Sequence, residues 1–232
     1  MESHQFAFRS WSSHKNWILF FGAVVISSLF YSRYVLSIGM FAWVALSFFE
    51  ETSGRGWRFR PWFRWFGRNP AEQAISAFPL IFVMVFISLL WSDWTSFGLS
   101  RVRLALPFIG LPLAFLHLPH FRAKDIDFLK VVLVLSAVVS MAHVIFHAFV
   151  STSGSGLDRG QSLATPVSHV RYGLLIALSS LSAFNLFYFK SSLSFARRMR
   201  WGMGVFCLVL IFFTFYLSVR TGWMALLIGF IL

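Results

Sequence analysis

Long runs of apolar residues follow one another along almost the whole chain, separated by short polar or basic segments. Eight such runs can be counted, and only 12% of all residues are charged. About 20 apolar residues in a helix span a bilayer core, where the backbone must satisfy its own hydrogen bonds. The runs are continuous rather than alternating, which favours helices over barrel strands. The sequence therefore predicts an all-α, polytopic transmembrane helical bundle and excludes an ordinary soluble domain.

The predicted spans number about seven, with a truncated eighth at the C-terminus. Residues 16–49 contain one charge, Arg33, and are too long for a single crossing, so we break them at Ser32–Arg33 into a helical hairpin. The eighth run stops at Leu232, before it could cross, so we expect the chain to be the N-terminal part of a longer protein. The runs cover approximately residues 17–32, 34–49, 74–91, 104–118, 131–150, 170–189, 202–219 and 223–232.

The basic residues predict the orientation. With the N-terminus in the cytoplasm, 14 of the 20 Lys and Arg fall inside and 6 outside, as the positive-inside rule expects. The net charge of +12 therefore indicates membrane topology, and we predict no nucleic-acid partner. The predicted outer set is Arg33, Arg101, Arg103, Arg159, Arg171 and Arg220.

We treat residues 1–232 as a single transmembrane domain with two notable connecting segments. Residues 50–73 mix five Arg with three Trp and three Phe, and are predicted to be a basic aromatic cytoplasmic loop. This loop could hold anionic lipid headgroups, or it could be an ordinary loop with aromatic anchors. Residues 151–169 are rich in Ser, Gly and Thr, which predicts a flexible loop on the periplasmic side.

Four outer arginines are the candidate binding residues. Arg101 and Arg103 precede the fourth span, Arg171 begins the sixth, and Arg220 lies between the seventh and eighth. Guanidinium groups bind phosphate through paired hydrogen bonds and stay charged, so such a cluster could hold a pyrophosphate. Alternatively, each arginine could reach the lipid headgroups separately. His169, beside Arg171, is a possible auxiliary residue.

The sequence offers no catalytic base and no metal site. His143 and His147 share one face of the fifth span, but that span contains no acidic residue to complete a zinc site, so a polar helix–helix contact is the simpler interpretation. The single cysteine, Cys207, lies in an apolar run and cannot form an intramolecular disulfide. We predict no cofactor, no metal and no catalytic residue within these 232 residues.

Two stretches of the sequence carry motifs of a known family. The first is Leu89–Trp94 with Arg103–Pro107 and Leu111–Leu113, and the second is His169–Gly173 with Ser218–Trp223. Together they resemble the O-antigen ligase and O-antigen polymerase family of bacterial membrane proteins. The second stretch departs from the family's usual Ser-Arg form, because Val219 separates Ser218 from Arg220. The resemblance extends loosely from about residue 75 to the end.

The resemblance implies a metal-independent glycosyltransferase of the bacterial inner membrane. Such enzymes transfer a glycan from an undecaprenyl-pyrophosphate carrier to lipid A core, in ligases, or to a growing glycan, in polymerases, during lipopolysaccharide or surface polysaccharide biosynthesis. The resemblance implies that Arg171 and Arg220 bind the pyrophosphate of the carrier, with Arg101 and Arg103 as further candidates. The resemblance also implies a catalytic histidine in a loop beyond residue 232. We therefore expect residues 1–232 alone to transfer no glycan. The alternative is a transporter or flippase for an anionic or lipid-linked substrate.

Overall fold

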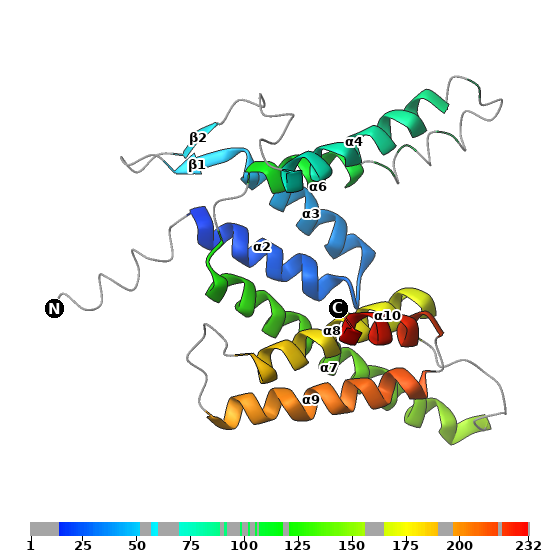
Figure 1. Cartoon of the computed structure of the whole chain (residues 1–232). Coiled ribbons are helices and arrows are strands. Elements are labelled where there is room, and N and C mark those ends of the chain that lie inside the picture. Colours follow the sequence, from blue (N-terminus) through cyan, green and yellow to red (C-terminus); the bar gives the residue numbers. More distant parts are fainter. Residues whose placement is uncertain are drawn as a thin grey trace. The chain divides into compact units, whose positions relative to one another are not determined.

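The computed structural model describes residues 14–51, 57–59, 70–88, 91, 98, 102, 105, 107–117, 121–155, 165–189, 197–217 and 220–231. These residues form a series of helices and one short pair of strands (Figure 1). The elements are α2 (His14–Ser28), α3 (Arg33–Ser47), β1 (Phe49–Glu51), β2 (Trp57–Phe59), α4 (Pro70–Ser88), α6 (Pro107–His117), α7 (Ala123–Ser155), α8 (His169–Tyr188), α9 (Arg197–Tyr216) and α10 (Arg220–Ile231).

Each of the eight predicted apolar runs contains a helix, so the helical prediction is confirmed. Within the described part of the chain, three helical stretches are long and apolar enough to cross a membrane, namely Ala123–His147, His169–Tyr188 and Arg198–Tyr216. Shorter apolar helical stretches lie at Arg33–Ser47, Ala77–Ser88 and Thr221–Ile231. The chain is accordingly a helical membrane protein, while the number of spans and the side of the N-terminus stay predictions.

The break predicted at Ser32–Arg33 is confirmed, because α2 ends at Ser28 and α3 begins at Arg33. The amide of Val35 donates to Ser32 Oγ at 3.4 Å. Ser32 therefore caps the start of α3, where the first helical amides have no partner within the helix. At the other ends of the two helices, His14 Nε2 lies 2.7 Å from the carbonyl oxygen of Leu46.

Residues 50–73 are not a loop throughout, contrary to the prediction. Strands β1 and β2 pair antiparallel, with Phe49 opposite Phe59 and Glu51 opposite Trp57. Aromatic side chains favour extended backbone, so the residues read as membrane anchors also favour strands. Helix α4 then begins at Pro70, because proline has the backbone angle of a first helical residue and needs no amide partner there.

The predicted loop at residues 151–169 is also shorter than expected. Helix α7 continues to Ser155 and α8 already begins at His169. Extending an established helix adds one hydrogen bond per residue, so a polar Ser-Thr-Ser-Gly-Ser end does not stop it. Residues 156–164 of the predicted loop lie outside the described residues.

The contacts within the chain define two compact units. Unit 1 comprises residues 1–21 and 38–120, and unit 2 comprises residues 22–37 and 121–232. The predicted single transmembrane domain stays a prediction. In unit 1, α4 packs on α6, and the ring of Trp43 meets that of Phe115 edge to face at 5.2 Å. A Cβ added at Gly110 of α6 would touch Val44 of α3.

Unit 2 is organised around α8, which packs against α7, α9 and α10 (Figure 1). Its core contains large fully buried side chains from different elements, including Phe30, Tyr172, Ile176 and Leu210. Asp125 caps the start of α7, because its Oδ2 accepts a hydrogen bond from the amide of Arg122 at 2.7 Å. A carboxylate at this third helical position stabilises the first turn.

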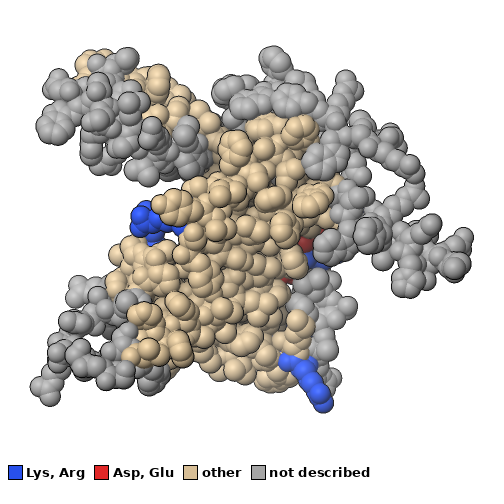
Figure 2. Space-filling model, turned by 180° about the vertical axis from the view of Figure 1, so that it is seen from behind, with Lys and Arg blue, Asp and Glu red and all other residues tan. Residues whose placement is uncertain are grey.

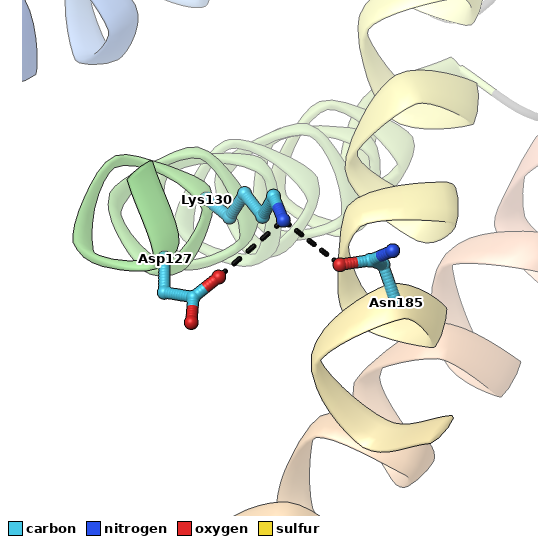
Figure 3. A network of polar contacts seen from close by, with 3 residues as sticks. All are labelled: Asp127, Lys130 and Asn185. Carbon is cyan, nitrogen blue, oxygen red and sulfur yellow. Dashed lines mark hydrogen bonds and ion pairs between the residues drawn. The ribbon is translucent and has the colours of Figure 1, made fainter. Parts of the chain in front are cut away.

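A polar contact joins α7 to the C-terminal half of α8. Lys130 Nζ donates to Asn185 Oδ1 at 2.8 Å and lies 3.4 Å from Asp127 Oδ1 (Figure 3). The side chain of Asp127 is only 11% exposed. The Lys130 ammonium group contacts both Asp127 of α7 and Asn185 of α8, so it links the two helices at this point.

Candidate functional site: the paired starts of α8 and α10

Helices α8 and α10 begin at the same end of unit 2, the end at which α7 and α9 finish (Figure 1). Their first turns are in contact through two glycines. A Cβ added at Gly222 would lie 3.1 Å from the carbonyl oxygen of Gly173 and 3.1 Å from Thr214 Cγ2. Small residues allow two helix backbones to approach closely. Gly222 therefore permits the close contact between the two helix starts.

Each glycine follows a predicted site arginine by two residues. Arg171 precedes Gly173, and Arg220 precedes Gly222. Two residues correspond to about 3 Å along a helix axis, so both arginines belong to the turns that meet at the crossing. The Arg171 side chain is exposed. Arg220 is the first residue of α10, and its side chain lies outside what the structure describes.

Tyr172 anchors the first turn of α8. Its side chain is completely buried, and its ring meets Phe30 and Phe213 edge to face at 6.4 and 6.3 Å. Its hydroxyl accepts a hydrogen bond from Ser140 Oγ of α7 at 3.1 Å. Successive helical residues point about 100° apart, so burial of Tyr172 turns Arg171 outward.

The start of α10 is held by the end of α9. Trp223 Nε1 donates to the carbonyl oxygen of Thr214 at 3.2 Å, and the Trp223 ring meets Phe215 at 4.1 Å. The indole therefore satisfies its polar group while its ring packs against an aromatic neighbour. These contacts and the Gly222 crossing set the position of the α10 first turn against both neighbouring helices.

The electrostatics of the two helix starts favour an anion. Neither α8 nor α10 has an acidic residue in its first turn, and Ser168 gives no side-chain hydrogen bond to the first turn of α8. The first amides of a helix carry partial positive charge and bind anions readily. The two adjacent helix starts carry partial positive charge and the exposed Arg171 guanidinium is a cation, so their attractions for an anion add.

The remaining predicted residues are not brought into this arrangement by any described contact. His169 is the first residue of α8 and is half-buried. Arg101 and Arg103 lie outside the described residues. On α7, His143 and His147 are exposed with ring centroids 6.3 Å apart. Among the described residues no group of three or more His, Cys, Asp or Glu could hold a metal.

Sequence reasoning singled out the arginines and overlooked their neighbours Tyr172, Gly173 and Gly222. A signal was present, because Arg171-Tyr172-Gly173 and Arg220-Thr221-Gly222 share an Arg-x-Gly spacing at the start of a helix. The partner Ser140 had no such signal, since nothing in the α7 sequence indicates which hydroxyl faces α8.

A scan against protein-family models, a search of curated proteins and a search of solved structures each found no match for this chain.

Proposed function

We propose that this chain belongs to a bacterial inner-membrane glycosyltransferase of the ligase or polymerase type. In this proposal the paired starts of α8 and α10 bind the pyrophosphate of an undecaprenyl-pyrophosphate-linked glycan, which the whole protein transfers to lipid A core or to a growing glycan at the periplasmic side. Arg171 and Arg220 are the binding residues, with Arg101 and Arg103 as further candidates.

The observation that carries the proposal is the contact between Gly173 and Gly222. It brings together two first turns that each carry an arginine, although 49 positions separate Arg171 and Arg220 in the sequence. The two helix starts and the exposed Arg171 guanidinium offer hydrogen-bond donors suited to a diphosphate, and in this proposal Arg220 supplies a second guanidinium. The motif resemblance supports the same pair of residues.

The chemistry fits such an array. Breaking the bond between a sugar and pyrophosphate leaves negative charge on the departing phosphate oxygen. Donors already oriented toward that oxygen stabilise the charge as it develops, without reorganisation during the reaction. Guanidinium groups remain protonated at any accessible pH, so the stabilisation needs no metal ion. The two arginines would thus hold the carrier before transfer and stabilise it as a leaving group.

The test is glycan transfer by the full-length protein in membranes. Arg171→Ala and Arg220→Ala should each reduce transfer at least about a hundredfold, as removal of one such donor commonly does. Arg171→Lys should recover only part of the activity, because an ammonium group lacks the planar two-pronged geometry. Arg33→Ala is the matched control, since Arg33 is exposed at the start of α3 and is predicted on the same side.

Each result has a defined meaning. Loss of transfer in both site variants, with normal membrane insertion and an active Arg33→Ala control, supports the proposal. Unchanged transfer in the Arg171→Ala, Arg220→Ala double variant contradicts it. If the wild type transfers no glycan but moves an anionic or lipid-linked substrate across the membrane, and the two variants lose that movement, the protein is a transporter or flippase.

A further inference from the structure

Two of the three arginines at the start of helix α9, Arg198 and Arg200, point in opposite directions. Arg200 turns inward, and one of its guanidinium nitrogens donates to the carbonyl oxygen of Phe187 at 3.0 Å. It begins a buried face that continues through Met203, Cys207 and Leu210. Arg198 is exposed, and the residues that follow it at alternating spacings of three and four are exposed too. These spacings mark one continuous helix face.

The exposed face changes in character along its length. It begins with the charge of Arg198, continues with an aromatic residue, and then becomes wholly apolar. We call this set the α9 stripe. It consists of Arg198, Trp201 (64% exposed), Val205 (57%), Leu208 (69%) and Phe212 (75%).

The order of these residues matches the layers of a phospholipid. A cation at the helix end lies at the level of the lipid phosphates, and tryptophan prefers the interface just below. Phe212 lies 14 residues beyond Arg198, about 21 Å along the helix, which is half of a bilayer roughly 40–45 Å thick including its headgroups. The stripe from Arg198 to Phe212 therefore has about the length of one leaflet.

The charge around the stripe favours an anionic headgroup. The described cations at this end of unit 2 include the exposed Arg122, Lys124 and Arg198, whereas Asp125 and Asp127 are buried. Figure 2 shows a described surface that is largely uncharged, with basic groups at the lower right, the end at which α9 begins, and at the left, and a small red and blue patch at the right. The surface charge available to a lipid phosphate at this end is thus positive.

We propose that the α9 stripe is a binding site for one anionic phospholipid. Arg198 holds the headgroup phosphate, Trp201 packs at the glycerol level, and an acyl chain lies along Val205 and Leu208. Trp201 is kept in place by the ring of Phe187, whose centroid is 5.6 Å away. The site is separate from the starts of α8 and α10 and does not depend on the proposed function.

The experiment uses the full-length protein purified in detergent and titrated with phosphatidylglycerol or phosphatidylcholine of identical acyl chains. Native mass spectrometry counts the bound lipids. The wild type should retain phosphatidylglycerol in preference to phosphatidylcholine. Arg198→Gln should weaken phosphatidylglycerol binding about fivefold, the typical contribution of one basic residue at an anionic surface. It should weaken phosphatidylcholine binding by less, because the choline group offsets the phosphate charge. Arg198→Lys should keep the preference.

Lys124→Gln is the matched control, because Lys124 is an exposed cation at the start of α7, at the same end of unit 2. It should change phosphatidylglycerol binding less than twofold. Equal losses in Lys124→Gln and Arg198→Gln would mean that lipids respond to the overall charge of this end, and the proposed site would be wrong. Absence of any phosphatidylglycerol preference in the wild type would overturn it as well.

A second measurement tests whether another protein helix covers the stripe. Leu208→Cys is introduced with Cys207→Ala, which removes the native, buried thiol. Under mild oxidation in the membrane no disulfide-linked dimer should form, because lipid occupies the stripe. Efficient dimer formation through Cys at position 208 would show that a second copy lies there and would overturn the proposal.

Discussion

At the scale of single residues, neighbours in the chain have opposite environments. Arg171 is exposed, whereas Tyr172 is fully buried with its hydroxyl bonded to Ser140. Burying a tyrosine hydroxyl without a partner would be costly in an apolar interior, so the Ser140 contact allows the ring to fill the core. The buried residue thereby determines the direction of the exposed one.

Tyr172→Phe and Ser140→Ala test this contact in a double-mutant cycle. Each single change should lower the free energy of unfolding by about 0.5–1 kcal/mol, and the coupling between the two should be about 0.6 kcal/mol, as found for hydrogen bonds within membranes. Unfolding in mixed micelles provides the measurement. Tyr34→Phe is the control, because Tyr34 is 85% exposed, and it should have no effect. Additive effects of the two changes would contradict a direct bond.

At the scale of elements, helix pairs in unit 2 are positioned by a few specific contacts. The α8–α10 crossing is close at Gly222, where an added Cβ would lie 3.1 Å from the Gly173 carbonyl oxygen. The α7–α8 pair is joined by Lys130 and Asn185 near the opposite end of α8. Apolar surface alone does not select such positions, because lipid tails are as apolar as the helices themselves.

Two glycines in helices of unit 2 provide a matched pair of substitutions. Gly202→Ala should be neutral or stabilise the protein by up to about 1 kcal/mol, since nothing lies within 4 Å of the added Cβ and alanine favours a helix. Gly222→Ala makes the same local gain but pushes a methyl group against the Gly173 carbonyl, which costs about 1–3 kcal/mol. The free energy of unfolding should therefore be at least about 1 kcal/mol lower for Gly222→Ala than for Gly202→Ala. Equal stabilities would contradict the close crossing.

Lys130→Met tests the polar link between α7 and α8. The change removes the ammonium group that lies beside the mostly buried Asp127 carboxylate and donates a hydrogen bond to the Asn185 amide oxygen. Loss of one partner of a fully buried pair costs about 3–5 kcal/mol, but Lys130 is 30% exposed, so we expect about 1–2 kcal/mol. Thermal unfolding in detergent provides the measurement. Lys124→Met, at an exposed position on the same helix, should change stability by less than about 0.5 kcal/mol.

At the scale of the whole molecule, the three long apolar helices alternate in direction. Helices α7 and α9 begin, and α8 ends, at one end of unit 2, and the described basic residues Arg122, Lys124, Arg198 and Arg200 lie there. The positive-inside rule therefore predicts that this end is cytoplasmic. The starts of α8 and α10 would then face the other side of the membrane.

Single cysteines test this orientation after Cys207→Ala has removed the native thiol. Val170→Cys, exposed at the start of α8, should react with a membrane-impermeant maleimide in intact cells. Arg198→Cys, exposed at the start of α9, should react only after the membrane is permeabilised. The reverse pattern would mean that the predicted orientation is inverted. The proposed pyrophosphate site at the starts of α8 and α10 would then lie on the cytoplasmic side.

The sequence predicted the helices well and part of the candidate site. Apolar runs identified each of the eight helices that the described residues form, and the charge of Arg33 located the first turn between helices. The boundaries were less accurate: part of the predicted loop at 50–73 is a strand pair, and six residues of the predicted loop at 151–169, namely 151–155 and His169, are helical. The arginines were recognised by their chemistry, whereas Tyr172 and the two glycines were not, because their roles depend on contacts with distant residues.

The membrane character of the chain, its helices and its expected orientation could be inferred from the amino-acid sequence, because these depend on the solvation of each segment taken alone. Which faces of the helices meet became clear only from the packing of the folded chain. In water an apolar helix face identifies the core, but in a membrane the core-facing and lipid-facing sides are both apolar. The crossing of Gly173 with Gly222, the burial of Tyr172 beside Arg171, and the opposite directions of Arg198 and Arg200 therefore follow from packing between helices.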